Sequence, residues 1–136
     1  MIVDTGNHRA TFYTGLPSSH GASAGFALFQ ADLVSAATGT TSSTVNQPLA
    51  VAVSTTGQIA FADAVNNRVL LFYETPIAIG AAHAVLGQAN FTTGTAWGGG
   101  SAGAAVMNGP TGLCWSGTSL LVAGGGMRRV MKFSPA

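Results

Sequence analysis

The sequence predicts an all-β fold built from one repeated unit of about 60 residues, with four short antiparallel strands in each complete unit. Three observations support this prediction. Segments of similar sequence recur at a nearly constant interval along the chain. Between glycine and proline residues, short runs alternate large and small apolar side chains, which is typical of strands. No segment has the sustained 3.6-residue apolar period of an amphipathic helix.

Two independent sets of residues define the repeat. The first is a turn motif in which three arginines are 59 and 61 residues apart. Its aligned residues are Asp4 with Asp63, Asn7 with Asn66, and Arg9 with Arg68 and Arg129. The second set is Gln30 and Gln88, which are 58 residues apart. A proline follows each copy of the turn, at Pro17, Pro76 and Pro135. Two sets that share one period indicate a true internal repeat.

The middle copy of the repeat is complete and predicts four strands, over residues 49–54, 58–63, 68–73 and 83–88. A glycine at 57 supplies the positive φ that a tight turn between the first two strands needs. The chain therefore divides into the end of one unit (1–30), a complete unit (31–90) and the start of the next (91–136), about two and a half units in all. Long loops are expected near 31–47 and 89–109.

Four-stranded units in series are typical of the blades of a β-propeller. The turns DTGNHR (4–9) and DAVNNRVLLF (63–72) resemble the NHL repeat, as do the strand LAVAVS after Pro48 and the turn at Gly57. The 60-residue period and the segment VLGQANF are similar to a bacterial long-repeat variety of this family. The third copy departs from the motif, with Gly124 in place of the Asp and Met127 in place of the Asn. The resemblance implies a partial propeller, because such rings typically close with roughly six blades.

The charge composition excludes several classes of function. Only 7% of the residues are charged and the formal net charge is +1, which gives no basic surface for nucleic acid or an anionic membrane. No apolar run approaches the length of a membrane span, and no signal peptide is visible at the N-terminus. The single cysteine, Cys114, excludes an internal disulfide and is expected to be a small buried packing residue.

The repeated Asp-x-x-Asn-x-Arg turn is interpreted as a structural clasp, in which the arginine meets the carboxylate five residues before it. Arg129 is expected to belong to the same clasp, and Gly124→Asp is expected to be neutral or stabilising. The alternative is a cation or ligand site lined by Asp4 and Asp63, although oxygen-ligand sites usually hold more acidic groups.

No cofactor, metal site or catalytic residue is predicted. The histidines His8, His20 and His83 are candidates for a zinc set, but no metal-ligand spacing accompanies them. Some propellers with NHL-like blades are lyases that use metal-bound histidines near the axis, and none of these three is expected on an inner strand. No G-x-S-x-G nucleophile elbow is present.

Two loop residues are candidates for contact or modification. Trp97 either provides an exposed stacking platform for a sugar or peptide, or folds back over an apolar edge. Asn90 begins the sequon Asn90-Phe91-Thr92, which permits N-glycosylation.

The sequence favours a non-catalytic binding or scaffold module whose loops contact a protein or glycan partner. A structural protein whose open blades assemble with copies of itself, in a closed oligomer or a filament, is the alternative from another class. A propeller hydrolase or lyase is a third. The scarcity of lysine suggests an extracellular or cell-envelope setting.

Overall fold

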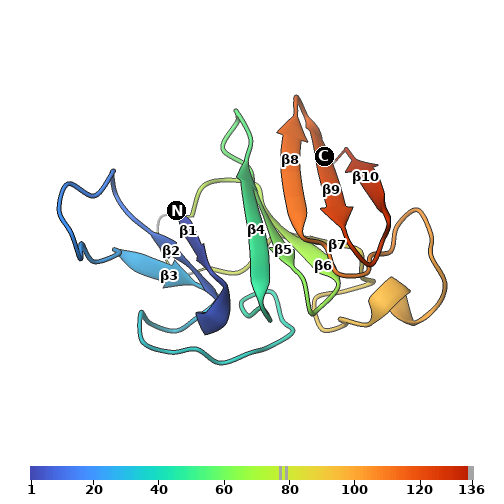
Figure 1. The fold of residues 1–136 in the computed structure, drawn as a ribbon, viewed down its shortest axis with the longest axis horizontal. Helices are drawn as coiled ribbons and strands as arrows, with labels where there is room; N and C mark the ends of the chain where they lie inside the picture. Colours follow the sequence, from blue (N-terminus) through green and yellow to red (C-terminus); the bar gives the residue numbers. More distant parts are fainter. Residues whose placement is uncertain (77, 79, 135–136) are drawn as a thin grey trace.

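The computed structural model describes residues 1–76, 78 and 80–134, and over these the chain forms ten strands in three antiparallel sheets, none of which closes on itself. The sheets follow one another in chain order from the N-terminal to the C-terminal end of the molecule (Figure 1). Pro135, expected to follow the third copy of the turn, lies outside the described residues. The predicted all-β fold is confirmed.

The three sheets contain three, four and three strands. The first sheet consists of β1 (Ile2–Asp4), β2 (Arg9–Phe12) and β3 (Phe26–Leu28). The second consists of β4 (Pro48–Val53), β5 (Ile59–Asp63), β6 (Arg68–Phe72) and β7 (Ala84–Leu86). The third consists of β8 (Gly112–Ser116), β9 (Ser119–Gly124) and β10 (Arg129–Phe133). Two short 3-10 helices, η1 (Thr5–Asn7) and η2 (Ala96–Gly99), lie between strands. Neither they nor any other described helix has the length and apolar content to cross a membrane.

The four strands expected in the middle of the chain are all present, and their ends differ from the prediction by at most two residues. The last of them is shorter than expected because Gly87 adopts a positive φ of 90° and ends the strand at Leu86. β4 begins at Pro48. Proline has no backbone N–H, and at the first residue of a strand this costs no hydrogen bond in the interior of the sheet.

Two hydrophobic clusters lie between the sheets and hold them together. The cluster between the first and second sheets is centred on three aromatic rings, with Phe29 packed edge-on against Phe61 at 5.0 Å and against Phe72 at 6.0 Å between centroids. The cluster between the second and third sheets is aliphatic and rich in methionine. Its buried members are Ala60, Val69, Leu71, Met107, Leu120, Val122, Met127 and Met131. The second sheet is therefore covered on both faces.

Residues that the sequence aligns also share unusual backbone conformations. Three columns of the alignment have positive φ at each of their described positions. These columns are His8, Asn67 and Arg128; Phe29 and Gly87; and Gln47 and Gly109. Non-glycine residues rarely adopt this conformation, so its recurrence shows that the aligned segments turn in the same way. Phe29 is fully buried, so the packing of its ring offsets the strain of its backbone.

Candidate functional site

The most highly organised polar cluster in the described chain is the clasp between Asp63 and Arg68. Asp63 is the last residue of β5 and Arg68 is the first residue of β6, and the two are directly paired across the strands. Arg68 Nε lies 2.6 Å from Asp63 Oδ2, and neither side chain has any exposed surface. A fully buried ion pair requires further hydrogen bonds to satisfy the polar atoms that it removes from water.

Arg68 makes these additional bonds to the two long loops. Its Nη2 donates to the carbonyl oxygens of Thr41 and Thr44, both at 2.9 Å, in the loop that precedes β4. Its Nη1 donates to the carbonyl oxygen of Phe91, in the loop that follows β7. One guanidinium group therefore joins its own turn to both loops. The planar, multi-donor guanidinium suits this role, whereas a lysine ammonium would lack the same geometry.

The Asp63 carboxylate is also fully engaged. Oδ1 accepts the backbone N–H of Asn46 at 2.7 Å, and Oδ2 accepts the Asn66 side-chain amide at 2.9 Å. Burial raises the pKa of Asp63 above its ordinary value, while the hydrogen bonds from Asn46 and Asn66 and the nearby Arg68 oppose that rise. With a guanidinium beside it and both oxygens occupied, Asp63 is poorly suited to bind a cation. The geometry therefore favours the clasp interpretation over a cation site at this turn.

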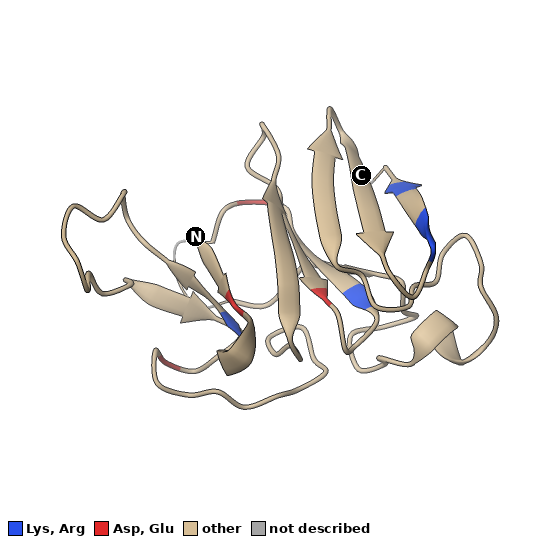
Figure 2. Cartoon of the chain, viewed as in Figure 1, with Lys and Arg blue, Asp and Glu red and all other residues tan. Residues whose placement is uncertain are grey.

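The N-terminal copy of the turn has the same arrangement in a more exposed setting. Arg9 Nε lies 2.8 Å from Asp4 Oδ2, and the Asn7 amide lies 3.0 Å from both oxygens of Asp4. Arg9 Nη1 donates to the Leu33 carbonyl, as Arg68 does to Phe91. The hydrogen bond from Asn7 is the main cause that lowers the pKa of Asp4, and Arg9 adds to the effect. Figure 2 shows both acid–arginine pairs at the ends of their strands.

The third copy is built differently. Gly124 occupies the position of Asp63 and is paired with Arg129 across β9 and β10. A Cβ atom at Gly124 would overlap the Gly109 carbonyl oxygen and would lie 2.9 Å from Met127 Cε. The expectation that Gly124→Asp is neutral or stabilising is therefore wrong. The glycine lets the turn approach the segment before β8 directly, so no carboxylate fits between them.

Arg129 shares the register of Arg9 and Arg68 but has a different partner. Its side chain is exposed, Nη2 donates to the Gly103 carbonyl, and the guanidinium lies 5.3 Å from the centroid of the Trp97 ring. Trp97 is half-buried and packs against the cluster between the second and third sheets. This packing favours the interpretation in which Trp97 folds back over an apolar edge over the one in which it is an exposed stacking platform. The cation–π contact helps to hold it there.

Sequence reasoning missed the residues that join neighbouring sheets. His8 precedes the first clasp arginine and Asn67 precedes the second. His8 Nδ1 accepts the backbone N–H of Gln47 at 3.0 Å, and Asn67 Oδ1 accepts the backbone N–H of Gly109 at 2.9 Å. Both acceptor residues have left-handed φ, and both donors lie one to three residues before the first strand of the next sheet. The alignment of His8 with Asn67 was the available signal, although it did not reveal their shared role as acceptors.

Gln30 and Gln88, which occupy the same position of the repeat, each bind two backbone carbonyl oxygens. The Gln30 amide donates to the His8 carbonyl at 2.9 Å and to the Ala37 carbonyl at 2.7 Å. The Gln88 amide donates to the Asn67 carbonyl at 3.0 Å and to a carbonyl seven residues ahead, that of Thr95, at 2.8 Å. Each glutamine therefore fixes the start of a long loop to the turn beneath it.

The three histidines do not form a common site. His8 is bound to Gln47, His20 is exposed in the loop after β2, and His83 stacks on Tyr73 at 5.3 Å between ring centroids. Among the described residues, no group of three or more His, Cys, Asp or Glu side chains is placed to hold a metal ion.

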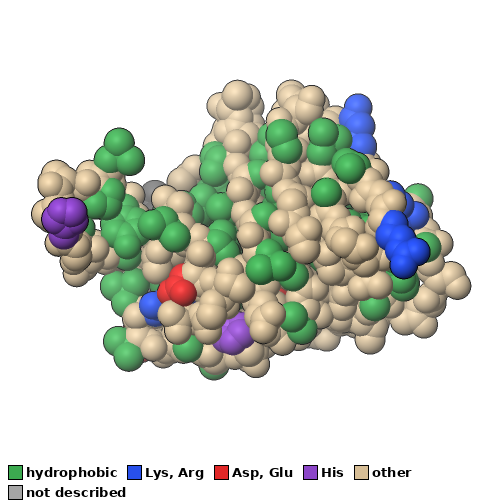
Figure 3. All heavy atoms as spheres, viewed as in Figure 1, with side chains coloured by type: hydrophobic (Ala, Val, Ile, Leu, Met, Phe, Trp, Pro, Cys, Tyr) green, Lys and Arg blue, Asp and Glu red, His purple; other side chains and the backbone are tan. Residues whose placement is uncertain are grey.

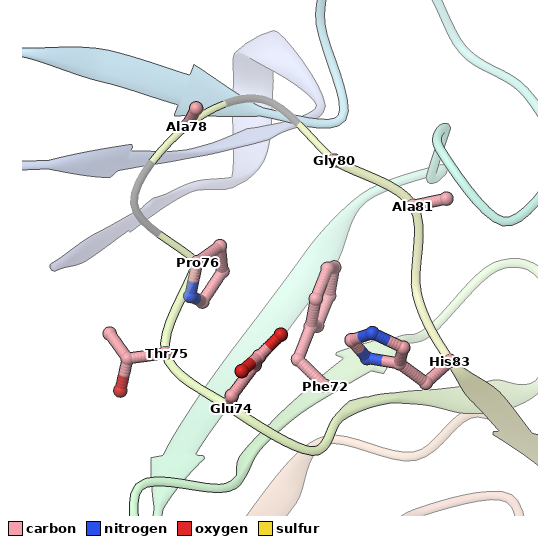
Figure 4. Close-up of a pocket in the computed structure, with 8 residues that line it drawn as sticks. All are labelled: Phe72, Glu74, Thr75, Pro76, Ala78, Gly80, Ala81 and His83. Carbon is pink, nitrogen blue, oxygen red and sulfur yellow. The ribbon is translucent and has the colours of Figure 1, made fainter.

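A hollow of about 410 Å³ lies beside the end of β6. Figure 4 shows Glu74 and His83 at this hollow with the ring of Phe72 between the two backbone segments that carry them. His83 Nδ1 accepts the backbone N–H of Tyr73 at 3.2 Å, so this ring nitrogen already has a structural partner. The hollow thus combines a carboxylate, an imidazole and an aromatic ring.

Two further predictions have different outcomes. Cys114 is exposed, so the expectation that it is buried is wrong. It lies on the face of β8 that points away from the second sheet, and no described sheet covers that face. Asn90 is exposed, and its Oδ1 accepts both the backbone N–H and the hydroxyl of Thr92 at 2.9 Å. The sequon is thus accessible and folded into a local turn.

Comparison with known protein families, curated proteins and solved structures finds no match. The recurring elements of this region are the Asp-Arg clasp, the glutamine that binds two carbonyl oxygens (Gln30 and Gln88), and the acceptor side chain that joins neighbouring sheets (His8 and Asn67). All three connect loop backbone to the turns and strand ends, and they therefore fix the loops in place.

Proposed function

We propose that the three sheets are blades of an NHL-type β-propeller and that the chain is a non-catalytic binding or scaffold module. In this proposal, the long loops at one end of the sheets contact a protein or glycan partner. The single observation that carries it is the position of Arg68, which ties both long loops of the second sheet to one buried ion pair. A binding surface made of loops needs such anchoring, because ordering flexible loops on binding reduces affinity.

The arrangement of strands and turns supports the propeller interpretation. The sheets contain three, four and three antiparallel strands in chain order, as expected if the first unit lacks its first strand and the third lacks its last. Equivalent hydrogen bonds join the first sheet to the second, through His8, and the second to the third, through Asn67. The same type of hydrogen bond therefore joins both pairs of neighbouring units, as is typical of repeated structural units that contact only their neighbours.

The chemistry of the loops supports the choice of partner. The turns η1 and 64–67 and both long loops gather at the same end of the sheets, shown at the bottom of Figure 1. This loop end is rich in threonine, serine and glycine and carries few charges. Hydroxyl and backbone groups suit hydrogen bonding to a neutral polar surface such as a glycan. They provide little for a strongly charged ligand.

A pair of matched variants tests this proposal. Ser43 is exposed in the loop before β4, at the loop end, whereas Thr118 is exposed in the turn between β8 and β9, at the opposite end. Binding of the parent chain to a glycan array and to immobilised candidate proteins should be lost with Ser43→Arg and retained with Thr118→Arg. Binding that tolerates Ser43→Arg but not Thr118→Arg would contradict the proposed surface.

A further inference from the structure

The third sheet leaves one apolar face uncovered by any described residue. Residues that share this face are paired in register across the sheet, with Gly112 opposite Ala123 and Ala123 opposite Val130. With Cys114 and Leu121 they line a shallow hollow of about 330 Å³. Val130 is 65% exposed and Cys114 is also exposed. Contiguous apolar surface of this kind marks an interaction site more often than ordinary protein surface.

The equivalent face of the second sheet shows what such a face is built to contact. Ala62 aligns with Ala123 and Val69 aligns with Val130, and both residues of the second sheet have no exposed surface. They are buried because the third sheet packs larger side chains, including Leu120 and Val122, against the face of small residues. The same pairing occurs between the first and second sheets, where Ala10, in the position of Val69, is buried beneath the phenylalanines of the second sheet. The chain therefore forms this type of interface twice.

The first sheet carries the opposite half of this interface on its own uncovered face. Ile2 lies in the position of Phe61, and its register partner Thr11 lies in the position of Leu70. In the second sheet, Phe61 and Leu70 are the residues that pack against the preceding sheet. Ile2 is 55% exposed and lines a hollow of about 430 Å³ on the first sheet.

We propose that the uncovered face of the third sheet docks on the uncovered face of the first sheet of a second copy of this chain. Each copy has the uncovered third-sheet face at one end and the uncovered first-sheet face at the other. The contact would therefore continue the two sheet-to-sheet interfaces that already exist within the chain. Such a contact is heterologous, joining different faces of the two copies, and it produces a ring if the rotation closes and a filament if it does not. The association does not depend on which partner the loops bind.

The few charges near these faces are compatible with such docking. Figure 3 shows charged side chains at isolated places on a surface of mainly apolar and neutral polar atoms. On the first sheet, Asp4 and Arg9 neutralise one another in the clasp. On the third sheet, Lys132 lies on the docking face itself, opposite Leu121, and is exposed on the edge strand β10, from which its flexible chain can place the ammonium group in solvent.

Three single variants test the proposal by analytical ultracentrifugation over a concentration series. Val130→Glu changes the third-sheet face and Ile2→Glu changes the first-sheet face. Val34→Glu is the matched control, because Val34 is 89% exposed in the loop before β4. The parent and Val34→Glu are expected to associate, whereas Val130→Glu and Ile2→Glu are each expected to remain monomeric. An equimolar mixture of the two monomeric variants is expected to form a dimer that grows no further, because one intact contact remains between them.

The single cysteine gives a second measurement on the parent chain itself. Cys114 lies on the proposed docking face, so its rate of modification by a maleimide should fall as the protein concentration rises and should recover in Ile2→Glu. A parent chain that stays monomeric at high concentration would overturn the proposal, as would a Cys114 rate that is independent of concentration. Normal association of Ile2→Glu would indicate that the third-sheet face pairs with itself, which would also overturn it.

Discussion

Replacing Arg68 by alanine removes the centre of the buried clasp and should destabilise the chain strongly. The substitution leaves the Asp63 carboxylate buried without its counter-charge, although the bonds from Asn46 and Asn66 remain. It also removes the donors to the carbonyl oxygens of the two long loops. The expected loss therefore combines an unpaired buried charge with backbone acceptors that lose their partner.

The size of the effect follows from burial. Removing one partner of a buried ion pair costs about 3–5 kcal/mol, whereas exposed pairs contribute about 0–1 kcal/mol. Since neither Arg68 nor Asp63 is exposed, Arg68→Ala belongs in the first class. Arg9→Ala is the natural control, because it removes the same contact where the arginine is 15% exposed and Asp4 is 28% exposed. A domain of this size has about 5–15 kcal/mol of stability, so Arg68→Ala should remove a large fraction of it.

Urea unfolding followed by tryptophan fluorescence measures the difference. The midpoint of Arg68→Ala should fall by about 2 M relative to the parent, and that of Arg9→Ala by a small fraction of this. The double variant Asp63→Ala with Arg68→Ala should lose less than the sum of the two single variants, since it leaves neither charge unpaired. A midpoint for Arg68→Ala equal to that of the parent would refute the clasp.

Three further predictions concern other parts of the same repeat. Gly124→Asp should destabilise the fold by about 1–3 kcal/mol, because its side chain would overlap the segment before β8. The control Gly125→Ala, whose Cβ would meet nothing within 4 Å, should be nearly neutral in the same urea assay. The pKa of Asp4 in the folded chain is below its ordinary value of 3.8. The ionised Asp4 carboxylate therefore stabilises the fold at pH values above 3.8, and this stabilisation is lost as the pH falls through the pKa of the folded state. The gap in urea midpoint between the parent and Asp4→Asn should therefore narrow from about pH 6 to about pH 2.5; a constant gap would contradict this. Asn67→Ala should cost about 1–3 kcal/mol, and Asn67→Gly, which keeps the left-handed φ but not the bond to the third sheet, should recover only part of that in thermal unfolding.

The sequence predicted the strands well because their pattern is local. Alternating side chains in 49–54 and the β-branched and aromatic run in 68–73 are sufficient to indicate strands, whichever residues they later contact. The contact between Asp63 and Arg68 was equally predictable, because the two residues flank a single turn between antiparallel strands. Features set within a few residues of chain were thus accessible from sequence.

Features that depend on distant segments were not predictable in this way. The overlap at Gly124 arises from Gly109, fifteen residues earlier in the chain, and nothing in the turn motif indicates that approach. Cysteine is a residue type that is usually buried. Cys114 is nevertheless exposed, because no described sheet covers its face of the third sheet. The bonds from Arg68 to Thr41 and Phe91 likewise depend on how the loops fold over the turn.

The central claim is that the buried clasp holds the two long loops in place, and amide hydrogen exchange of the parent and Arg68→Lys tests it most directly. Lysine keeps the positive charge but cannot reproduce the four contacts of the guanidinium. The Asn46 amide, which donates to Asp63, and the amides of residues 39–45 and 91–95 should lose protection in Arg68→Lys, while those of β8 and β9 should keep theirs. Unchanged protection in both loops would contradict the claim.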